Sequence, residues 1–486
     1  MKKYFLILIA VFAYAKTYNV STLEQLQNSF ADIANLNEDA TIYLASKEYE
    51  LNSTIVYIDD VNKKITIEAN NSTIISKNTQ PFFIDNNQST IEFDNITIKN
   101  GENNESAGAI YSSGNLIIKN STFKNNSSIS GGAISANSIE IIDSKFINNS
   151  SVYGGAIDCI GLANIKNSIF KNNSARYGGA VVANTIAVDN SYFTKNSADY
   201  GGALSADDSV NISNSYFKSN SAIYGGALSF ATNGTVKNSI FKDNFATYAG
   251  AIIADSGTNI INSAFLNNRA KYGGAVSIDS VNIDHSTFIN NYASSYASAF
   301  YGSGTIKNSI FIDFLDEIVQ DGDVNIQNSI IDTNKIYKDT YALNANNIYN
   351  YSYDELHFTK GFRLSSNSPA INKAVATDVT DDIDNNPRDS YPDIGASEYS
   401  SEYNSNSNAQ KRIFIDSLSS GWSLVSFNED TYPQSKIFNS SKVVWIYRDG
   451  KWLSYSKDVN VKNTIQSNSI PYINVIKNGE GFWILK

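Results

Sequence analysis

The sequence predicts an all-β protein: a parallel β-helix with a capping helix at its N-terminal end and a small β domain at its C-terminal end. Two markers carry this prediction, a Gly-Gly-Ala step and a Phe followed three residues later by Asn. Both return every 23 or 24 residues, which accommodates three short strands with their turns, or one coil of a solenoid. The first marker, or a close variant, has its alanine at Ala109, Ala133, Ala156, Ala180, Ala203, Ala227, Ala251, Ala275 and Ala299, and the second has its phenylalanine at Phe123, Phe146, Phe170, Phe193, Phe217, Phe241, Phe265 and Phe288.

The residues between the markers favour strands over helices. Apolar residues alternate in short runs such as "NIKNSIF" and "GGALSA", and proline is absent from Phe82 to Ser368. No helical periodicity accompanies the repeat. We therefore expect coils of three strands that turn at asparagine and glycine corners.

Residues 1–15 have the pattern of a signal peptide. Two lysines precede an apolar run over residues 4–12, and small residues follow at Ala13 and Ala15, so we expect cleavage before Lys16. The run is too short to cross a bilayer, and no later stretch reaches the ~20 apolar residues of a transmembrane helix. We expect an exported protein, at the cell outer membrane surface or in the extracellular medium.

Residues 16–90 are expected to form the N-terminal cap and the first coils. Ser21 and Glu24 make a capping-box pattern ahead of "LEQLQNSFADIA". A short amphipathic helix at this point would cover the open edge of the first coil, where backbone groups otherwise lack partners.

Residues 91–333 are expected to form the repeated coils, about a dozen in all counting the first ones. An Ile or Val two residues before each corner should point inward, and the Phe five residues later should also be buried. Five is an odd step, so the chain must bend between them. Asparagine tolerates the left-handed bend, and we expect its amides to form an internal ladder. The corners are Asn120, Asp143, Asn167, Asn190, Asn214, Asn238, Asn262, His285, Asn308 and Asn328.

The repeat stops near Thr333. Residues 334–399 are expected to form an irregular closing segment, and residues 400–410 read as a polar linker. Residues 411–486 hold all four tryptophans among alternating strand patterns, with Asp449-Gly450 as a hairpin turn, which predicts a small β domain.

The recurring "GGAI" and "FKNN" phrases resemble the repeats of the polymorphic outer membrane protein family. The resemblance spans roughly residues 90 to 314. It implies a right-handed, pectin-lyase-like β-helix on a bacterial surface. The C-terminal autotransporter barrel of that family has no counterpart here. A second resemblance links "SNSPAINKA" and "DDIDNNPRDSYPDIGASEY" to segments that close secreted β-helix proteins, and "GWSLVSF" with "GFWIL" resembles C-terminal attachment or sorting domains.

Few side chains suit catalysis. Polysaccharide lyases and hydrolases share this architecture, but a hydrolase needs carboxylates about 5 to 10 Å apart, and Asp207 with Asp208 is the nearest candidate. Arg176 and Arg269 stand in different repeats without the acidic cluster of a lyase. We expect no catalytic residue and no cofactor, with a polysaccharide lyase or hydrolase as the alternative to an adhesin-like scaffold.

Three single residues have structural explanations. Cys159 occupies a small-residue core position, and it cannot form a disulfide because it is the only cysteine. His285 stands where the neighbouring coils have asparagine, and His357 lies in the irregular segment without a visible partner. None of the three is expected to be reactive or to bind a metal.

Two sets of residues are candidate binding sites. Asp382, Asp384 and Asn386 alternate as oxygen ligands do in a calcium loop, although the usual glycine is absent, and an acidic solvated turn is the alternative. A stripe of stacked tyrosines either binds glycan rings or stabilises the coils, and we favour stabilisation. The stripe is Tyr153, Tyr177, Tyr200, Tyr224, Tyr248, Tyr272 and Tyr296.

The net charge of -11 argues against nucleic acid as a partner. We expect a monomer without a transmembrane span that contacts a host or neighbouring cell surface or an extracellular glycan.

Overall fold

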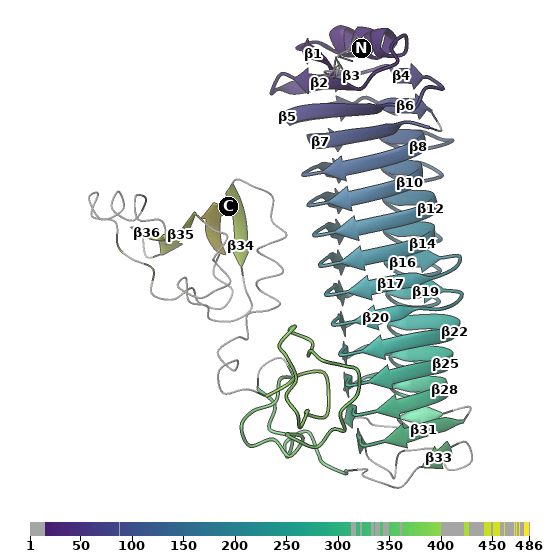
Figure 1. Ribbon diagram of the computed structural model, residues 1–486, viewed down its shortest axis with the longest axis vertical. Coiled ribbons are helices and arrows are strands. Elements are labelled where there is room, and N and C mark those ends of the chain that lie inside the picture. The colour runs from purple at the N-terminus through teal and green to yellow at the C-terminus, as the bar shows by residue number, and fades with distance from the viewer. Residues whose placement is uncertain are drawn as a thin grey trace, which may run out of the picture.

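The computed structural model describes residues 15–86, 88–312, 317–320, 323–331, 335, 341–343, 349–359, 362–399, 422–426, 442–448, 451–456, 461, 471, 473, 476 and 481–485. The predicted signal peptide, apart from Ala15, and the predicted linker lie outside these residues. One parallel sheet of 31 strands winds into about 13 coils, which form the rod of Figure 1. The predicted parallel β-helix is confirmed.

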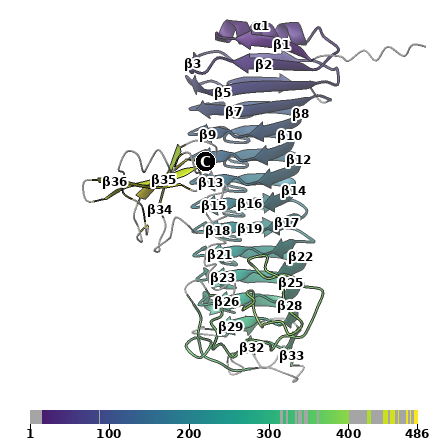
Figure 2. The ribbon, with the colours of Figure 1, turned by 60° about the vertical axis from the view of Figure 1, so that its left-hand side comes forward.

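Each coil of the rod contributes strands of two kinds, which stack in separate columns (Figure 2). Strands before the corner are β8 (Ile110–Lys119), β10 (Ile134–Ile142), β12 (Ile157–Lys166), β14 (Val181–Asp189), β16 (Leu204–Ala206), β17 (Val210–Ser213), β19 (Leu228–Phe230), β20 (Thr235–Lys237), β22 (Ile252–Ile261), β25 (Val276–Asp284), β28 (Phe300–Lys307), β30 (Val319–Gln320), β31 (Val324–Gln327) and β33 (Tyr341–Leu343). Strands after the corner are β9 (Thr122–Lys124), β11 (Lys145–Ile147), β13 (Ile169–Lys171), β15 (Tyr192–Thr194), β18 (Tyr216–Lys218), β21 (Ile240–Lys242), β23 (Ala264–Leu266), β26 (Thr287–Ile289), β29 (Ile310–Ile312) and β32 (Ile330–Ile331). A further pair, β24 (Arg269–Tyr272) and β27 (Tyr292–Tyr296), forms a separate two-stranded sheet.

A helix covers the first coils, as predicted. The elements here are β1 (Lys16–Val20), α1 (Leu23–Ile33), β2 (Ala40–Leu44), β3 (Glu48–Leu51), β4 (Ile55–Ile58), β5 (Lys64–Ser76), β6 (Phe82–Asp85) and β7 (Thr90–Lys99). Phe30 of α1 packs against Tyr57, with ring centroids 5.6 Å apart. The Gln27 side chain accepts from Val56 N and donates to Val56 O, both at 3.1 Å. The helix therefore covers the core and satisfies backbone groups at the exposed edge.

The capping box lies one residue later than the sequence analysis placed it. Thr22 caps α1 and accepts from Gln25 N at 3.1 Å, and the Gln25 side chain accepts from Thr22 N at 3.2 Å. The same Gln25 oxygen accepts from Ser21 N at 2.7 Å. Ser21 and Glu24 are therefore not the reciprocal pair, because the helix begins after Thr22.

The predicted inward rows are confirmed. The Ile and Val side chains before the corner are buried from coil to coil, as are the phenylalanines after it. From Phe123 to Phe311, neighbouring rings lie 4.4–5.0 Å apart with interplanar angles of 3–7°. The rod core is thus a continuous stack of matching side chains.

The corners are confirmed, but the internal ladder is made by a different asparagine. The predicted corner residues have φ between 45° and 51°, and in the early coils their side chains lie at the surface, as Asn120 does. The chain bends again two residues after each Phe, for example at Asn148 with φ 55°. This second bend turns the next residue inward. The buried ladder residues are Asn126, Asn149, Asn173, Asn196, Asn220, Asn244, Asn268 and Asn291.

Each ladder asparagine bonds to the coil on either side of it. Nδ2 of Asn149 donates to Oδ1 of Asn173 at 3.0 Å and to Phe123 O at 3.1 Å. Its Oδ1 accepts from both N and Nδ2 of Asn126 at 3.0 Å. Buried amides with all these partners stabilise the stack, because no donor is left unpaired by burial.

The Gly-Gly-Ala step is required by close packing. The first glycine adopts a positive φ, 60° at Gly154, which favours a residue without Cβ. The second lies against the next coil, since a Cβ built on Gly202 would be 2.1 Å from Gly226 O. The step therefore fixes how closely consecutive coils approach.

The closing segment packs along the side of the rod, where its irregular chain runs beside the last coils (Figure 1). Its residues Leu356, Leu364 and Ile394 form a second core with Ile310 and Ile312 of β29. The equivalent outward positions of the early strands β9 and β11 include lysines and threonine instead. The outward residues of the short strands therefore become apolar where the segment covers them.

The closing segment is held by the corner residues of four coils. Asn238 donates to Asn385 Oδ1 at 2.7 Å, and Asn308 exchanges two hydrogen bonds of 3.0 Å with the Val375 backbone. The corner residues that contact it are Asn214, Asn238, Asn262 and Asn308. Thr287 of β26 adds a hydrogen bond, and Lys237 of β20 adds an ion pair with Asp381. We call these four corner residues the docking row; three of them are buried.

The small domain is an antiparallel sheet in the order β34-β37-β35-β36. Its strands are β34 (Trp422–Ser426), β35 (Val443–Arg448), β36 (Lys451–Tyr455) and β37 (Gly481–Leu485). Asp449 and Gly450, the predicted hairpin turn, lie outside the described residues, between β35 and β36. Within the part of the chain that the structure describes, no helix is long and apolar enough to cross a membrane.

Candidate functional site

The predicted tyrosine stripe exists as a continuous stack along the rod. From Tyr153 to Tyr296, neighbouring rings have centroids 4.9–5.6 Å apart and interplanar angles of 5–18°. The rings at the two ends, Tyr153 and Tyr296, are 44% and 49% exposed. Six stacked pairs stabilise the packing between consecutive coils along this part of the rod.

Stacking limits what the tyrosine stripe can bind. Each inner ring has a neighbouring ring on both faces, so mainly its edge and hydroxyl are directed outward. Sugar rings stack on aromatic faces rather than on edges, and these inner faces are occupied. Cations also contact the stripe, with Arg176 5.3 Å from the Tyr177 centroid and Lys271 4.9 Å from that of Tyr272. The stripe is therefore a better stabilising element than a glycan platform.

The residues that immediately precede the tyrosines differ from coil to coil. Val152 and Ile223 are exposed apolar residues, whereas Arg176 and Asp199 lie 3.7 Å apart as an exposed ion pair. A surface row with this variety does not present one chemical pattern to a repeating polymer. The row is suited to distinct local contacts along the rod.

Asp158 is an acidic residue that the sequence analysis missed. It lies on β12 and points outward, in a row whose other members are Tyr111, Ser135, Val182, Ser205, Ser229, Ile253, Ser277 and Tyr301. Burial raises the pKa of its carboxyl to about 6; the Ser130 hydrogen bond lowers it and the charge of Asp207 raises it. Asp158 could have been noticed in the sequence because it is the one acidic residue in a row that is otherwise uncharged.

The acidic pair named from the sequence is exposed. Asp207 and Asp208 lie in a turn after β16, where Asp208 Oδ1 accepts from Thr232 Oγ1 at 3.1 Å. Arg176 and Arg269 are on different coils, as expected. The charge of Asp207 also acts on Asp158, which lies two coils earlier in the stack.

Cys159 lies in the core position predicted for it. Burial raises the pKa of its thiol to about 11, so the thiol is protonated and unreactive at neutral pH. It is stacked between Ala136 and Ala183.

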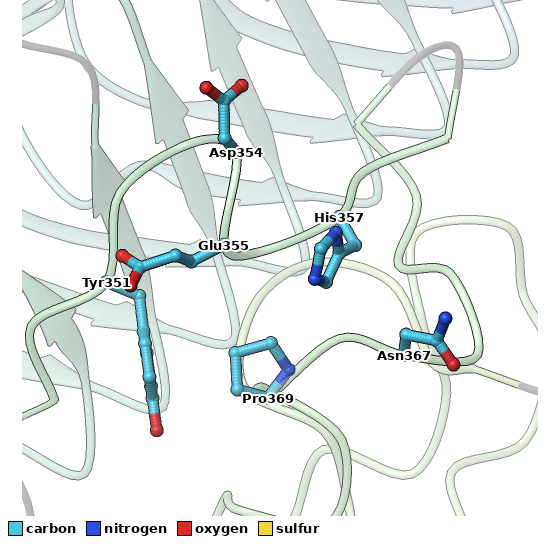
Figure 3. Close-up of a pocket in the computed structure, with 6 residues that line it drawn as sticks. All are labelled: Tyr351, Asp354, Glu355, His357, Asn367 and Pro369. Carbon is cyan, nitrogen blue, oxygen red and sulfur yellow. The ribbon is translucent and has the colours of Figure 1, made fainter.

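The two histidines lie in different settings. His285 is a buried corner residue whose Nδ1 is 2.8 Å from Asp284 Oδ1, and burial lowers its pKa. His357 lines an open pocket of about 470 Å³ with Tyr351, Asp354, Glu355, Asn367 and Pro369 (Figure 3). The Glu355 carboxylate accepts from Ser352 N and Oγ at 2.8 and 2.7 Å. These two hydrogen bonds make the Glu355 carboxylate part of the turn that begins at Ser352.

The candidate calcium residues have protein partners. Asp382 is buried and its Oδ1 accepts from Asp384 N and Asn386 N, at 2.9 and 2.8 Å. Asp384 forms a bidentate ion pair with Arg363. Among the residues that the structure describes, no group of three His, Cys, Asp or Glu side chains is arranged around a metal position. The turn is acidic but buried, and calcium binding stays a prediction.

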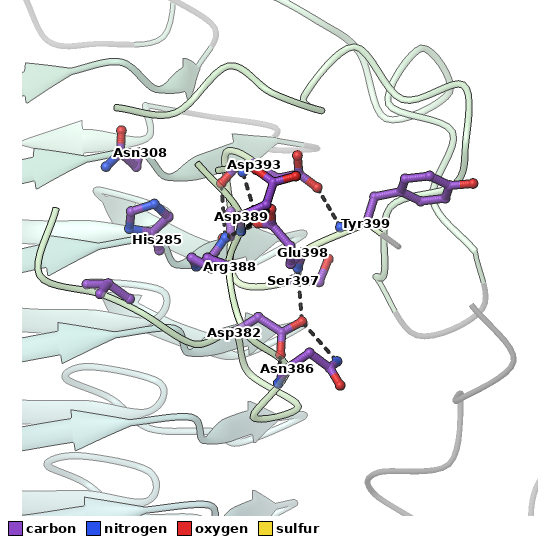
Figure 4. Close-up of polar contacts among 12 residues, drawn as sticks. His285, Asn308, Asp382, Asn386, Arg388, Asp389, Asp393, Ser397, Glu398 and Tyr399 are labelled. Atoms are coloured by element: carbon purple, nitrogen blue, oxygen red, sulfur yellow. Dashed lines mark hydrogen bonds and ion pairs between the residues drawn. The ribbon is translucent and has the colours of Figure 1, made fainter. Parts of the chain in front are cut away.

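Arg388 is the centre of this buried network (Figure 4). It donates to Glu398 Oε2 at 2.8 Å, to Asn262 Oδ1 at 3.0 Å and to Gly395 O at 2.8 Å. Burial and the neighbouring Glu398 raise the pKa of Asp393 to about 7. The network joins the closing segment to the docking row.

Comparisons with known proteins supply a fold neighbour and no family. No protein-family model matches the chain, and no curated protein matches it. Among solved structures, a mutant of the PL6 family alginate lyase AlyGC matches with a TM-score of 0.42 and 12% identity. The match covers 76% of this chain and 55% of that chain, so the present chain spans about half of that structure. At this identity no activity transfers, and the polymorphic outer membrane protein resemblance stays a prediction.

Proposed function

We propose that the protein is an exported rod that acts as an adhesin-like scaffold at the cell surface or after release. One observation carries the proposal: the rows that repeat along the rod face the core or the next coil, while the exposed row before the tyrosines changes in every coil. Repetition builds a stiff spacer. Variation on its surface supplies local contact sites.

The cellular location tests the first half of this proposal. Producing cells are separated into cytoplasm, periplasm, outer surface and medium, and the protein is followed with an antibody. We expect it at the outer surface or in the medium, without residues 1–15. Recovery in the cytoplasm with the leader still attached would contradict the proposal.

Contact with a surface is tested with the purified mature protein. It should bind intact cells or extracellular matrix in a saturable manner. The variant Ile223→Asp with Val152→Asp changes the variable row without touching the core, and should weaken this binding. Asn211→Ala, on an exposed position of β17, is the matched control. Equal binding by both variants would remove this row from the interaction.

A polysaccharide-degrading enzyme is the second candidate, and Asp158 is the observation that favours it. A general acid requires a raised pKa, and burial gives Asp158 a pKa of about 6, to which the charge of Asp207 adds. The protein is incubated with pectins, alginates and neutral glycans at pH 5 to 8. New reducing or unsaturated ends that disappear in Asp158→Asn but persist in Asp208→Asn would replace the scaffold proposal.

A further inference from the structure

The small C-terminal sheet exposes a cluster of aromatic residues on one face. Trp445 and Tyr447 alternate on β35, and Trp483 and Trp452 lie directly opposite them on β37 and β36. Residues paired across an antiparallel ladder share a face. Tyr447, Trp452 and Trp483 are 59%, 48% and 40% exposed. We call these four residues the aromatic face.

The opposite face of the same sheet is its core. Val444, Ile446, Phe482 and Ile484 are buried there, together with Ile473 and Ile476. The aromatic face is therefore not the side on which the sheet packs. An exposed group of large aromatic residues on a soluble domain is typical of a binding surface.

The rings of the aromatic face are arranged unlike those of the tyrosine stripe. Trp452 makes an angle of 81° with Trp445 and of 58° with Tyr447, whereas the stripe has angles of 5–18°. Tilted rings do not cover one another's faces. Within the described strands of this sheet, ring faces consequently remain free for a flat ligand with C–H groups, such as a sugar ring.

The charge of the small domain opposes that of the rest of the chain. Residues 411–486 contain ten Lys and Arg against six Asp and Glu, which leaves 27 against 42 for residues 1–410. Lys442 and Lys451, on the strands of this sheet or beside them, are exposed. The cationic balance favours an anionic partner, and two copies of this domain would repel each other.

We propose that the aromatic face binds an acidic polysaccharide. Sugar rings stack on Trp452 and Trp483. The net positive charge of the domain, to which the exposed Lys451 and Lys442 contribute, attracts their acidic groups. The choice of a glycan over single-stranded nucleic acid, which also combines stacking with charge, rests on the proposed export of the protein. The acidic rod is repelled by such a polymer, so the polymer is held at this end of the chain.

Binding of the mature full-length protein to immobilised carboxymethyl-dextran and to uncharged dextran tests the proposal. The two polymers share a backbone and differ in charge. We expect binding to carboxymethyl-dextran that weakens with salt, and little binding to dextran. Tyr447→Ala with Trp452→Ala should weaken binding about tenfold or more. Phe245→Ala, an aromatic 58% exposed on the rod, is the matched control and should bind normally.

Trp452→Phe and Lys451→Glu keep the proposal testable if the double variant does not fold. Trp452→Phe should retain most binding, and Lys451→Glu should lose it only for the charged polymer. Equal binding to dextran, unchanged binding by the folded double variant, stronger competition by oligo-dT than by free carboxymethyl-dextran, or a dimer that the double variant dissolves would each overturn the proposal. None of these outcomes bears on the cell fractionation, so failure here is distinct from failure of the proposed function.

Discussion

In the rod, each ladder asparagine bonds to the same residue type one coil on, whereas in the closing segment Arg388 gathers carboxylate, amide and carbonyl partners that occur once. The rod repeats the same coil-to-coil contacts, so its stability is a sum over similar coils. The closing segment depends on contacts that each occur once, and the buried Arg388 network is the most polar of them. A defect should therefore have graded consequences in the rod and all-or-none consequences in the closing segment.

The largest expected effect comes from Arg388→Ala. It leaves the buried Glu398 and Asp393 without their cation, which costs about 3–5 kcal/mol. We expect proteases to cleave within residues 349–399 while the rod keeps its circular dichroism signal. Arg176→Ala, an exposed arginine, is the control. Loss of the circular dichroism signal together with cleavage of the closing segment would show that the rod and the segment unfold as one unit. The contrast between them would then be wrong.

Asn196→Ala tests the rod side of the comparison. It leaves N and Nδ2 of Asn173 and the carbonyl of Phe170 without their partners, at about 1–3 kcal/mol for each buried group that stays unpaired. We expect a lower melting temperature and faster hydrogen exchange confined to the neighbouring coils. Asn211→Ala should change neither. Unfolding of the whole rod would show that the stability of the rod is not a sum over separate coils.

The closing segment should lose stability as the pH rises. The pKa of Asp393 is raised from 3.8 to about 7 in the folded protein, so the folded state favours the protonated acid. This contribution is complete below about pH 4 and disappears as the pH rises through 7. Melting temperatures measured across this range should fall, and Asp393→Asn should flatten the curve. A rise with pH in the wild type alone would contradict the assignment.

Tyr224→Ala should have a small effect. It removes two stacked pairs from the tyrosine stripe, worth about 0.5–1.5 kcal/mol each. We expect a slightly lower melting temperature and an unchanged glycan-array profile. Tyr391→Ala, exposed on the closing segment, serves for comparison. A lost glycan signal with an unchanged melting temperature would reverse our assignment of the stripe.

Calcium should have the smallest effect. Asp384 is paired with Arg363, and Asp382 accepts backbone donors, so a chelator should leave the melting temperature unchanged. Magnesium-loaded buffer is the control. A clear fall on chelation that added calcium reverses would establish the site that the sequence predicts.

The repeated parts of the molecule could be predicted from the sequence, and the single-use parts could not. The inward Ile and Phe rows and the corners follow from residue parity and from the conformational tolerance of asparagine. The sequence predicts the ladder at Asn120 and its equivalents, whereas the structure has it at Asn126 and its equivalents. The residue at the second bend, which turns Asn126 inward, varies in type from coil to coil, so no pattern marks that bend. The Arg388 network joins residues more than a hundred positions apart, which no local pattern reveals.

The docking row also determines which parts of the rod are interchangeable. From Asn120 to Asn190 the corner side chains form no hydrogen bond with the described closing segment, whereas Asn214, Asn238, Asn262 and Asn308 do. Duplicating or deleting one 24-residue unit among the former would change the rod by one strand spacing and reuse the same ladder geometry. The length of the rod can therefore change in steps of one coil during evolution, while the end that holds the closing segment stays the same.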